Sequence, residues 1–475
     1  MMNELHEECG VFGIYTKGNT NVVSAAYYAL YALQHRGQES CGIAVNDDGV
    51  IRCVKNPGLV NEVIDRDAIE ALGSGRMAVG HVRYGTYGTD PRQNAQPLVI
   101  NHIKGYMALA HNGALTNART LREELELKGS IFHMTSDAEV ISYIITRERL
   151  NCGSIEEAVV RSMDTLEGAY SMVVMSPRKL IAARDPRGFR PLCIGTMGED
   201  VVFASESCAL DAIGAKFVRD IEPGEVVIVD ENGIRSDRTH VGTKPISRCV
   251  FEYIYFARPD SVIDGSSVHN ARVRAGAFLA LEHPVQADVV IGVPDSGLDA
   301  AIGFARQSGI PYEIGFIKNK YIGRTFIQPT QADREDKVRI KLNVLGSVVK
   351  GKRVVLVDDS IVRGTTSARI VNMLREAGAT EVHFRSSSPA FMYPCYYGTD
   401  VDSQDKLIAC RYPLDEIAGV IGADSLGYLS HEAVSLLAEN TKGFCTACFD
   451  GKFPCEPTCP NSKRCYETKI SEAKK

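Results

Sequence analysis

Residues 353–369, RVVLVDDSIVRGTTSAR, constrain the fold more than any other stretch of this sequence. The apolar run VVLV predicts a buried strand, and a hydroxyl-rich loop at 364–367 leads into a helical pattern. Amides and hydroxyls at the start of a helix form an anion site that suits a monophosphate. Asp358 and Asp359, at the carboxyl end of the strand, suit ribose hydroxyls or hydrated Mg²⁺. The stretch therefore predicts a phosphate-ribose site on a parallel α/β sheet.

This stretch resembles the phosphoribosyl pyrophosphate (PRPP) signature of the type I phosphoribosyltransferases. The resemblance implies a second loop, which binds pyrophosphate, and the segment VVIGVPDSGLDAA at 289–301 fits it as a strand, a loop and a helix. The residues implied for the pyrophosphate are Pro294, Asp295, Ser296 and Gly297, those for the ribose phosphate are Asp358, Asp359, Gly364, Thr365, Thr366 and Ser367, and those for Mg²⁺ are Ser296, Asp358 and Asp359.

A basic segment, 318–343, lies between the two loops. On charge alone it is equally well a solvated surface loop. Next to two phosphate loops we interpret it as a lid that covers the pyrophosphate and excludes water from the reacting ribose carbon. The lid residues we expect near the phosphates are Lys318, Lys320 and Arg324.

The two halves of the chain differ in pattern. In the C-terminal half, strands such as ADVVIGVP alternate with helices such as ARIVNMLREAGA, which predicts a parallel sheet buried on both faces. In the N-terminal half, short strand-like runs are separated by glycine turns, which favours packed antiparallel sheets flanked by helices. A polar segment at 235–247 predicts a linker. The runs predict strands at 11–15, 42–46, 76–82, 106–113, 170–175, 180–185, 201–206 and 225–230, and helices at 22–34, 117–128, 137–150 and 155–166.

The net charge of −6 argues against a broad nucleic-acid surface. No window reaches the roughly 18 apolar residues of a membrane span, and the acidic start lacks the plan of a signal peptide. We therefore expect a cytoplasmic protein with no membrane or nucleic-acid partner.

Five short motifs in the N-terminal half occur in the order CGVFG (from Cys9), QHRGQES (34–40), HVRY (81–84), HNG (111–113) and TSD (135–137). Together they resemble the N-terminal-nucleophile glutamine amidotransferases. The resemblance implies an αββα layered domain in which the Cys9 thiol is the nucleophile and the α-amine of Cys9 is the base. It assigns the oxyanion to Asn112 and Gly113, and the α-carboxylate and α-ammonium of glutamine to Arg83 and Asp137.

Two residues of these motifs also have simpler interpretations. Cys9 alone would be a buried strand cysteine, and only the other four motifs favour a catalytic role. Arg36 is structural or interdomain rather than catalytic, since QHRGQES also fits a helix end followed by a glycine turn. If Cys9 is the nucleophile, its amine must be free, so residues 1–8 would be a propeptide that the chain removes by self-cleavage before Cys9.

The sequence contains fourteen cysteines. Disulfides do not explain them well, because disulfides are rare in a reducing compartment. Most singly placed ones suit buried thiols, but five fall within 445–465, and this density favours metal or cluster chemistry. The spacing Cys445-Thr-Ala-Cys448 serves zinc or a [4Fe–4S] cluster equally well, and Cys455, Cys459 and Cys465 could complete a local zinc site.

The whole chain resembles the glutamine PRPP amidotransferases that have both a propeptide and a C-terminal CxxC. This resemblance implies a structural [4Fe–4S] cluster, with Cys455, Cys459 and Cys465 outside the ligand set. It also implies an amidotransferase domain at 9–240 and an α/β phosphoribosyltransferase domain with a cysteine-rich tail at 241–475. The implied cluster ligands are Cys249, Cys395, Cys445 and Cys448.

The implied reaction moves the amide nitrogen of glutamine, as shielded ammonia, to Mg²⁺-bound PRPP. Its products are 5-phosphoribosylamine, glutamate and pyrophosphate, the first step of de novo purine synthesis. The family further implies a homotetramer and inhibition by purine nucleotides. Two alternatives are another cysteine-nucleophile amidotransferase, which the VDDSIVRGTTS loop argues against, and a non-catalytic nucleotide sensor, which has no use for a glutaminase site.

Overall fold

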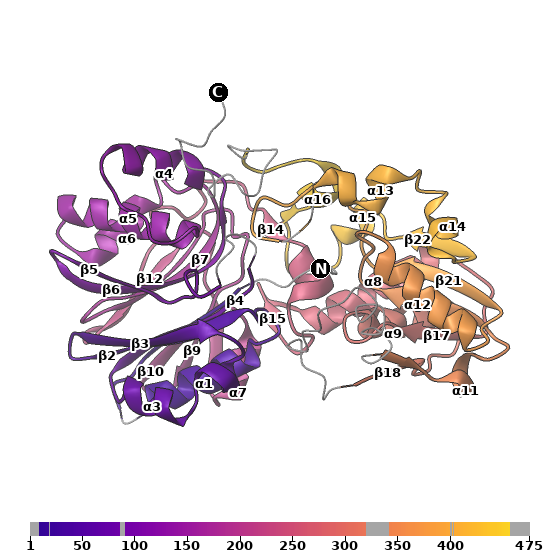
Figure 1. The fold of residues 1–475 in the computed structure, drawn as a ribbon, viewed down its shortest axis with the longest axis horizontal. Coiled ribbons are helices and arrows are strands. Elements are labelled where there is room, and N and C mark those ends of the chain that lie inside the picture. The colour runs from indigo at the N-terminus through magenta and orange to yellow at the C-terminus, as the bar shows by residue number, and fades with distance from the viewer. Residues whose placement is uncertain are drawn as a thin grey trace.

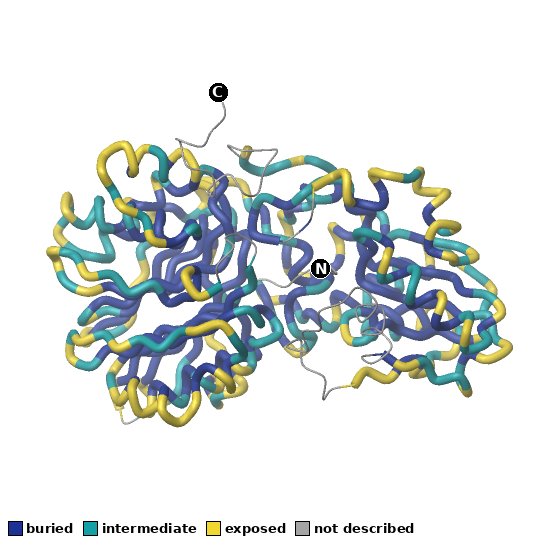
Figure 2. The backbone as a smooth tube through the Cα atoms, in the orientation of Figure 1, coloured by how far each residue is buried: buried dark blue, intermediate teal, exposed yellow. Residues whose placement is uncertain are grey.

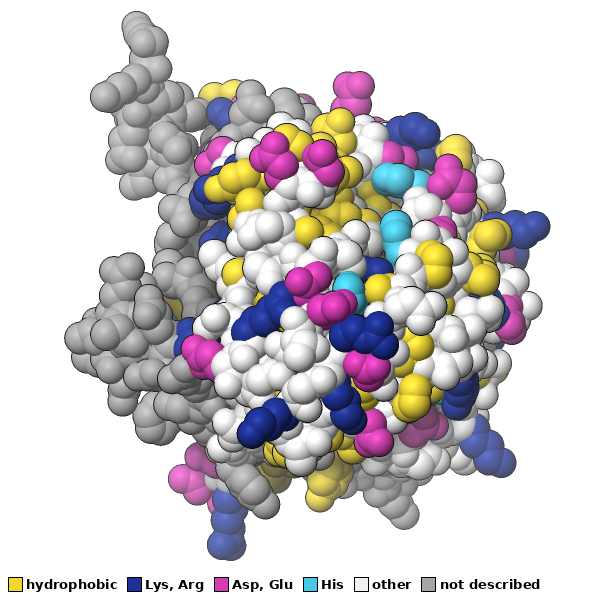
Figure 3. Space-filling model, turned by 90° about the vertical axis from the view of Figure 1, so that its right-hand side faces the viewer, with side chains coloured by type: hydrophobic (Ala, Val, Ile, Leu, Met, Phe, Trp, Pro, Cys, Tyr) yellow, Lys and Arg dark blue, Asp and Glu magenta, His cyan; other side chains and the backbone are white. Residues whose placement is uncertain are grey.

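The computed structural model describes residues 9–18, 20–85, 91–319, 342–399, 401 and 403–456. The described residues of the N-terminal half (from 9 to 240) and those of the C-terminal half (from 241 to 456) lie side by side along the long axis of the molecule (Figure 1). None of the helices in these ranges combines the length and the apolar composition that crossing a membrane requires. On the face of the C-terminal half seen in Figure 3, basic and acidic side chains are interspersed.

The N-terminal half consists of two stacked antiparallel sheets with helices on both outer faces, in the strand orders β11-β9-β10-β1-β4-β2-β3 and β13-β12-β8-β7-β6-β5. The first sheet comprises β1 (Gly10–Tyr15), β2 (Ser40–Asp47), β3 (Val50–Pro57), β4 (Met77–Arg83), β9 (Cys193–Met197), β10 (Asp200–Ala204) and β11 (Lys216–Asp220). The second comprises β5 (Leu98–His102), β6 (Gly105–Leu115), β7 (Gly168–Met175), β8 (Leu180–Arg184), β12 (Val226–Asp230) and β13 (Gly233–Asp237). The helices are α1 (Val22–Ala32), α2 (Val60–Val63), α3 (Arg66–Leu72), α4 (Ala118–Leu127), α5 (Asp137–Asn151), α6 (Ile155–Ser162) and α7 (Ser207–Ala212).

Strand β1 shows why the sheets stack. Its side chains alternate between two cores: Val11 packs between the sheets, whereas Phe12 and Ile14 pack on the helix side with α1. All six residues of β1 are buried, and each large apolar side chain buried in this way contributes about 1.5–3 kcal/mol. The strand is therefore covered on both faces, which is what the αββα prediction requires.

The eight predicted strands and four predicted helices of this half are all present. The sequence patterns missed β3, β5, β9, β11 and β13 and the short helices α2, α3 and α7. Four of the missed strands, β3, β5, β11 and β13, have half-buried or exposed side chains and lack a clear apolar alternation. The predicted linker at 235–247 is partly wrong, because β13 extends to Asp237 and pairs with β12.

The C-terminal half contains a four-stranded sheet in the order β17-β20-β21-β22, in which all neighbours are parallel. Its strands are β17 (Val289–Gly292), β20 (Arg353–Asp358), β21 (Glu381–Ser386) and β22 (Ser425–Tyr428). The main helices are α8 (Val268–Glu282), α9 (Gly297–Ser308), α12 (Thr365–Glu376) and α14 (Ile417–Ile421), and the apolar clusters place α8 and α9 on one face and α12 and α14 on the other. The parallel α/β prediction is confirmed.

The C-terminal half also contains shorter elements and an apolar core that reaches the N-terminal half. The apolar cluster under α8 and α9 also contains Ala169 and Phe189, so the core continues across the junction, where Figure 2 shows buried backbone. The shorter elements are β14 (Arg248–Cys249), the π-helix η1 (Glu252–Phe256), β15 (Val262–Ile263), β16 (Ser266–Ser267), β18 (Phe316–Lys318), β19 (Leu342–Val344), α11 (Gly346–Val349), the 3₁₀ helix η2 (Gln404–Lys406), α13 (Ile408–Arg411), α15 (His431–Val434), β23 (Phe444–Cys445) and α16 (Ala447–Asp450).

Candidate active sites

The first candidate site is a small pocket lined by residues of four of the five motifs, and the fifth, QHRGQES, contacts it through the ion pair of Glu39 with Arg83. Cys9 precedes β1, Arg83 ends β4, Gly113 lies in β6 and Asp137 begins α5. The Cys9 thiol lies 3.7 Å from the carbonyl oxygen of Tyr84. The residues lining the pocket are Cys9, Arg83, Tyr84, Gln96, His111, Gly113, Ser136 and Asp137.

Asn112 and Gly113 have the features of an oxyanion site. The Asn112 side chain is 1% exposed, and its Nδ2 has no hydrogen-bond partner within the part of the chain that the structure describes. Burying a hydrogen-bond donor without a partner costs free energy, and such donors often occur where a ligand binds. Gly113 has φ of +130°, and a Cβ there would lie 2.2 Å from the carbonyl oxygen of Ala169 on β7. Only glycine fits at this position.

Replacing Gly113 by alanine is expected to lower glutamine hydrolysis by about 10²-fold or more, because the strand must shift and carry the amide donor away from the oxyanion. Synthesis from free ammonia should remain. The measurement is kcat with each nitrogen donor. Gly129→Ala is the matched control, since Gly129 also has positive φ but a Cβ there meets nothing within 4 Å. An unchanged glutaminase rate in Gly113→Ala would exclude this oxyanion assignment.

Arg83 and Asp137 provide opposite charges across the pocket. Arg83 is 4% exposed and forms an ion pair with Glu39, which the motif pattern did not single out although it stands in QHRGQES. Burial raises the pKa of Glu39, and Arg83 partly offsets the rise. Asp137 accepts a hydrogen bond from the Leu115 amide (2.9 Å) and has His111 3.6 Å away. The pair matches the carboxylate and ammonium of an α-amino acid.

Two buried histidines support this pocket without adding charge. His81 Nε2 lies 2.9 Å from the carbonyl oxygen of His111, and burial lowers the pKa of His81 to about 3. Burial also lowers the pKa of His111. The amide of His111 donates to Gln96 Oε1 (2.8 Å), and no sequence signal marked Gln96. Both imidazoles are therefore neutral near pH 7.

The second candidate site lies at the carboxyl ends of β17 and β20, neighbouring parallel strands whose loops meet at one sheet edge. Asp358 and Asp359 are 8% and 6% exposed. Ser296, from the first loop, donates its hydroxyl to Asp359 Oδ2 (3.0 Å). Burial raises the pKa of Asp359 to about 6, although hydrogen bonds from Ser360 and Ser296 oppose it. The structure thus brings together the three residues that the sequence proposed for Mg²⁺.

Glycines allow both loops of this site to pack closely. A Cβ on Gly297 would lie 2.5 Å from the carbonyl oxygen of Val357, at the end of β20. Gly364 has φ of +81° and precedes the first turn of α12, whose amides face outward from the helix start. The next residues differ in exposure: Thr365 is exposed, Thr366 half-buried and Ser367 buried.

The loop 294–297 also has a basic neighbour. Lys318, at the end of β18, donates to Asp295 Oδ2, so the first of the three predicted lid residues lies beside the predicted pyrophosphate loop. The other two, Lys320 and Arg324, lie outside the described residues.

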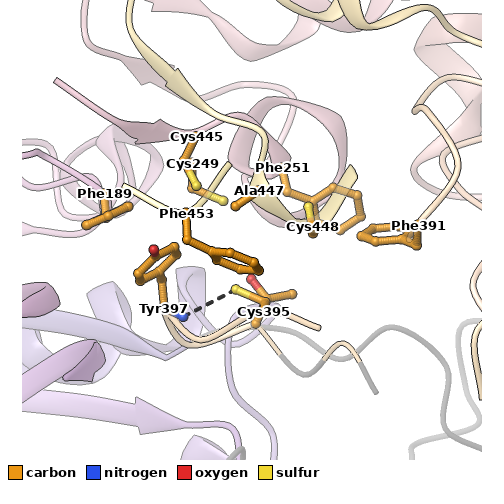
Figure 4. A pocket seen from close by; sticks show the side chains of 11 residues that line it. Phe189, Cys249, Phe251, Phe391, Cys395, Tyr397, Cys445, Ala447, Cys448 and Phe453 are labelled. Carbon is orange, nitrogen blue, oxygen red and sulfur yellow. Dashed lines mark hydrogen bonds between the residues drawn. The ribbon is translucent and has the colours of Figure 1, made fainter. Parts of the chain in front are cut away.

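Four cysteines from three parts of the chain line one apolar cavity (Figure 4). Cys249 on β14 and Cys445 on β23 are register partners in a parallel pair. Cys448 belongs to α16, and the Cys395 sulfur accepts a hydrogen bond from the Tyr397 amide (3.4 Å). The aromatic side chains of the lining are those of Phe189, Phe251, Phe391, Tyr397 and Phe453.

The structure bears on whether these thiols hold a single metal ion and on the position of Cys455. Across the described ranges, no group of three or more His, Cys, Asp or Glu side chains is placed to hold one metal ion. Cys455 does not line the cavity, and its sulfur lies 3.9 Å from the Thr116 hydroxyl of the N-terminal half. Burial raises the pKa of Cys445 to about 12, and the nearby Cys395 adds to the rise. Cys459 and Cys465 lie outside the described residues.

Comparisons with known proteins match both halves of the chain. Residues 81–212 match the model of a glutamine amidotransferase domain, and residues 267–387 match that of a phosphoribosyl transferase domain. The chain is 49% identical to the amidophosphoribosyltransferase of Bacillus subtilis, over 95% of each protein. It is also 49% identical to the amidophosphoribosyltransferase of Methanocaldococcus jannaschii, over 94% of this chain and 98% of that protein.

Solved structures resemble the chain over nearly its whole length. The glutamine PRPP amidotransferase of B. subtilis, complexed with ADP and GMP, superposes with a TM-score of 0.88 at 49% identity and covers 94% of this chain and 98% of that one. A structure described as the allosteric regulatory enzyme of purine biosynthesis has a TM-score of 0.90 at 47% identity, over 98% and 100% of the two chains. With this identity over both halves, the chain belongs to the amidophosphoribosyltransferase family.

Proposed function

We propose that this chain converts glutamine, water and PRPP into 5-phosphoribosylamine, glutamate and pyrophosphate, with ammonia passing between the sites shielded from water. The observation that supports this most is that one chain carries both sites. In one half, a thiol lines a pocket together with Gly113, the neighbour of Asn112, and in the other, two strand-end carboxylates lie beside a phosphate-type loop. A nucleotide sensor has no need of the first site, and other amidotransferases have no need of the second.

In the glutamine site, the Cys9 thiolate attacks the side-chain amide carbon, and the carbonyl oxygen becomes an oxyanion next to Asn112 Nδ2 and the Gly113 amide. The α-amine of Cys9, with an ordinary pKa of about 8, takes the thiol proton and returns it to the leaving ammonia. Water then cleaves the thioester and releases glutamate. The ion pair of Arg83 with Glu39 has to open so that Arg83 can bind the substrate carboxylate.

This role of the Cys9 amine requires a free N-terminus. Residues 1–8 lie outside the described residues, and we propose that they form a propeptide whose removal exposes the amine. The active protein should then begin at Cys9.

In the PRPP site, ammonia attacks carbon 1 of the ribose, and the bond from that carbon to pyrophosphate breaks. Asp358 and Asp359 are positioned for the ribose hydroxyls and, with Ser296, for hydrated Mg²⁺. Two carboxylate or hydroxyl contacts plus substrate oxygens suit Mg²⁺, which keeps several waters in such sites. The amides of Asp295 and Ser296 in the first loop and those of the start of α12 would bind the pyrophosphate and the 5-phosphate, with Lys318 beside the first loop.

The cysteine cavity fits an iron–sulfur cluster better than a single ion. Four thiols line one cavity, two of them buried and two half-buried, and no group of three or more ligands among the described residues is placed to hold one ion. Buried thiols need cationic partners to become thiolates. Cys249, Cys395, Cys445 and Cys448 would hold a [4Fe–4S] cluster. It would cross-link the tail to the body of the C-terminal half, because Cys249 precedes η1 and Cys445 lies in the tail.

Replacing Cys395 by serine is expected to remove most of the bound iron and acid-labile sulfide and to lower Tm by about 5 °C or more, as loss of a structural metal group does. Iron and sulfide analysis of anaerobically purified protein checks this. Cys410→Ser is the matched control, because Cys410 is exposed and does not line the cavity. Equal iron content in the two variants would contradict the ligand set.

The relatives suggest two further properties. Since the B. subtilis structure holds ADP and GMP, we propose that purine nucleotides inhibit this chain by occupying its phosphate sites. We also propose a cytoplasmic homotetramer.

The test of the function is pyrophosphate release from Mg²⁺-PRPP by anaerobically purified protein, with glutamine or with ammonia as nitrogen donor. We expect release with both donors. Release with ammonia alone would leave the phosphoribosyl transfer intact and exclude the glutaminase, whereas no release with either donor would exclude the proposed function.

A further inference from the structure

A buried arginine connects the backbone of the nucleophile residue to the other half of the chain. Arg36 is completely buried, and its Nε donates a hydrogen bond to the carbonyl oxygen of Cys9 (3.0 Å). Its two Nη groups donate to both carboxylate oxygens of Glu252 (2.9 and 2.8 Å). One of them also donates to Glu206 (2.6 Å). Arg36 thus binds Cys9 on one side and two carboxylates on the other.

The two carboxylates come from different halves. Glu206 lies in the N-terminal half, just before α7, whereas Glu252 is the first residue of η1 in the C-terminal half. Glu252 is 2% exposed and also lies 3.4 Å from Arg190 Nη1. Arg190 in turn donates to the carbonyl oxygen of Tyr397 (2.7 Å), again in the C-terminal half.

Charge balance shows what Glu252 contributes to this network. Burial lowers the pKa of Arg36, but Glu252 and Glu206 outweigh the burial and hold the pKa above its ordinary value. A guanidinium removed from water is stable only with paired charge and satisfied N–H groups. Without the charge of Glu252, the network loses one of its two anions, and Arg36 must rearrange to find new partners. Its hydrogen bond to Cys9 would then be lost or moved.

A second contact reaches the oxyanion side of the same pocket. Gly398, three residues after Cys395, packs so closely that a Cβ there would lie 3.3 Å from the carbonyl carbon of Gly113 and 3.1 Å from Arg190 Nη2. The C-terminal half therefore touches the glutamine site next to both the nucleophile and the oxyanion donor.

We propose that Glu252 of the C-terminal half is a positioning residue for the glutaminase reaction, holding Arg36 so that Arg36 fixes the backbone of Cys9. This inference rests on the proposed function of Cys9. It assigns the glutamine site a residue that is neither in the pocket nor in the same half of the chain. Because glutamine itself is bound by Arg83 and Asp137, Glu252 should affect kcat for glutamine hydrolysis far more than KM.

The test compares Glu252→Gln with Glu252→Asp, using glutamine hydrolysis without PRPP, ammonia-dependent synthesis and the rate at which iodoacetamide alkylates Cys9, followed by mass spectrometry. We expect Glu252→Gln to lower the hydrolysis kcat at least about tenfold, with KM within about twofold, and to slow alkylation of Cys9. Glu252→Asp keeps the charge and should recover part of both losses. Ammonia-dependent synthesis should stay within about twofold of the wild type.

The matched control is Asp264→Asn, which breaks another buried ion pair between the halves, to Arg184 (2.7 Å), without touching Arg36 or Glu252. It should leave the hydrolysis kcat and the alkylation of Cys9 near their wild-type values. The inference is overturned if Glu252→Gln hydrolyses glutamine at the wild-type rate, or if Asp264→Asn loses as much. It is also overturned if both Glu252 variants lose ammonia-dependent synthesis too, since Glu252 would then support the fold in general. A wild type that hydrolyses no glutamine would instead refute the role of Cys9.

Discussion

Replacing Cys9 by alanine is expected to lower glutamine-dependent synthesis of phosphoribosylamine by at least about 10³-fold. Among the described residues that line the pocket, Cys9 carries the only thiol, and the others offer the proposed binding pair, an imidazole and amide or hydroxyl groups. The PRPP site lies in the other half and does not use this thiol. Synthesis from free ammonia should therefore remain within about twofold of the wild-type rate.

Cys53→Ala is the matched control, since Cys53 lies on β3 of the same sheet but does not line the pocket. Its burial raises the thiol pKa to about 11, which keeps it unreactive. The measurement is the initial rate of phosphoribosylamine synthesis by each variant, with glutamine and with ammonia as nitrogen donor. Full glutamine dependence in Cys9→Ala would refute the nucleophile assignment.

Replacing Asp359 by alanine is expected to lower phosphoribosylamine synthesis from both glutamine and ammonia by about 10²-fold or more. The variant removes the carboxylate that accepts the Ser296 hydroxyl, so the first loop loses its link to the end of β20. It also removes a negative charge that the proposed Mg²⁺ site requires. Hydrolysis of glutamine alone should continue, because Asp359 does not line the glutamine pocket and has no hydrogen bond to Arg36 or Glu252.

Asp288→Ala is the control for this variant. Asp288 pairs with Arg353 at the opposite end of β20, away from the loops, and both side chains are partly exposed. It should change the PRPP-dependent rates by less than about twofold, since exposed ion pairs contribute little. PRPP-dependent rates near wild type in Asp359→Ala would exclude its assignment.

The sequence predicted those parts of the molecule in which the chemistry is local. A strand, an acid pair, a hydroxyl-rich loop and a helix are consecutive at 353–369, and the structure places them as predicted. The motifs around Cys9, Arg83, Gly113 and Asp137 were also predicted to meet, and they line one pocket. For these residues, the position in the strand or helix follows from short-range patterns.

What the sequence could not predict depends on long-range contacts. Glu252 is 216 residues from Arg36, and nothing in EYIYF distinguishes it from a surface acid. Gln96 gave no signal because its role is a single hydrogen bond to the backbone of His111. The cysteine spacing could not show that four thiols from three parts of the chain line one cavity, nor that Cys455 lies beside Thr116. Strands such as β11 were missed because exposed edges lack apolar alternation.

We propose that one chain couples glutamine hydrolysis to phosphoribosyl transfer. The most direct test is the ratio of glutamate to pyrophosphate that the protein releases from glutamine and saturating Mg²⁺-PRPP. Both products are measured over one time course with anaerobic protein that begins at Cys9. For the wild type we expect a ratio near one. In Cys9→Ala, glutamate release should be absent, whereas pyrophosphate release should continue when ammonia is the nitrogen donor. Glutamate release without pyrophosphate in the wild type would contradict the proposed coupling.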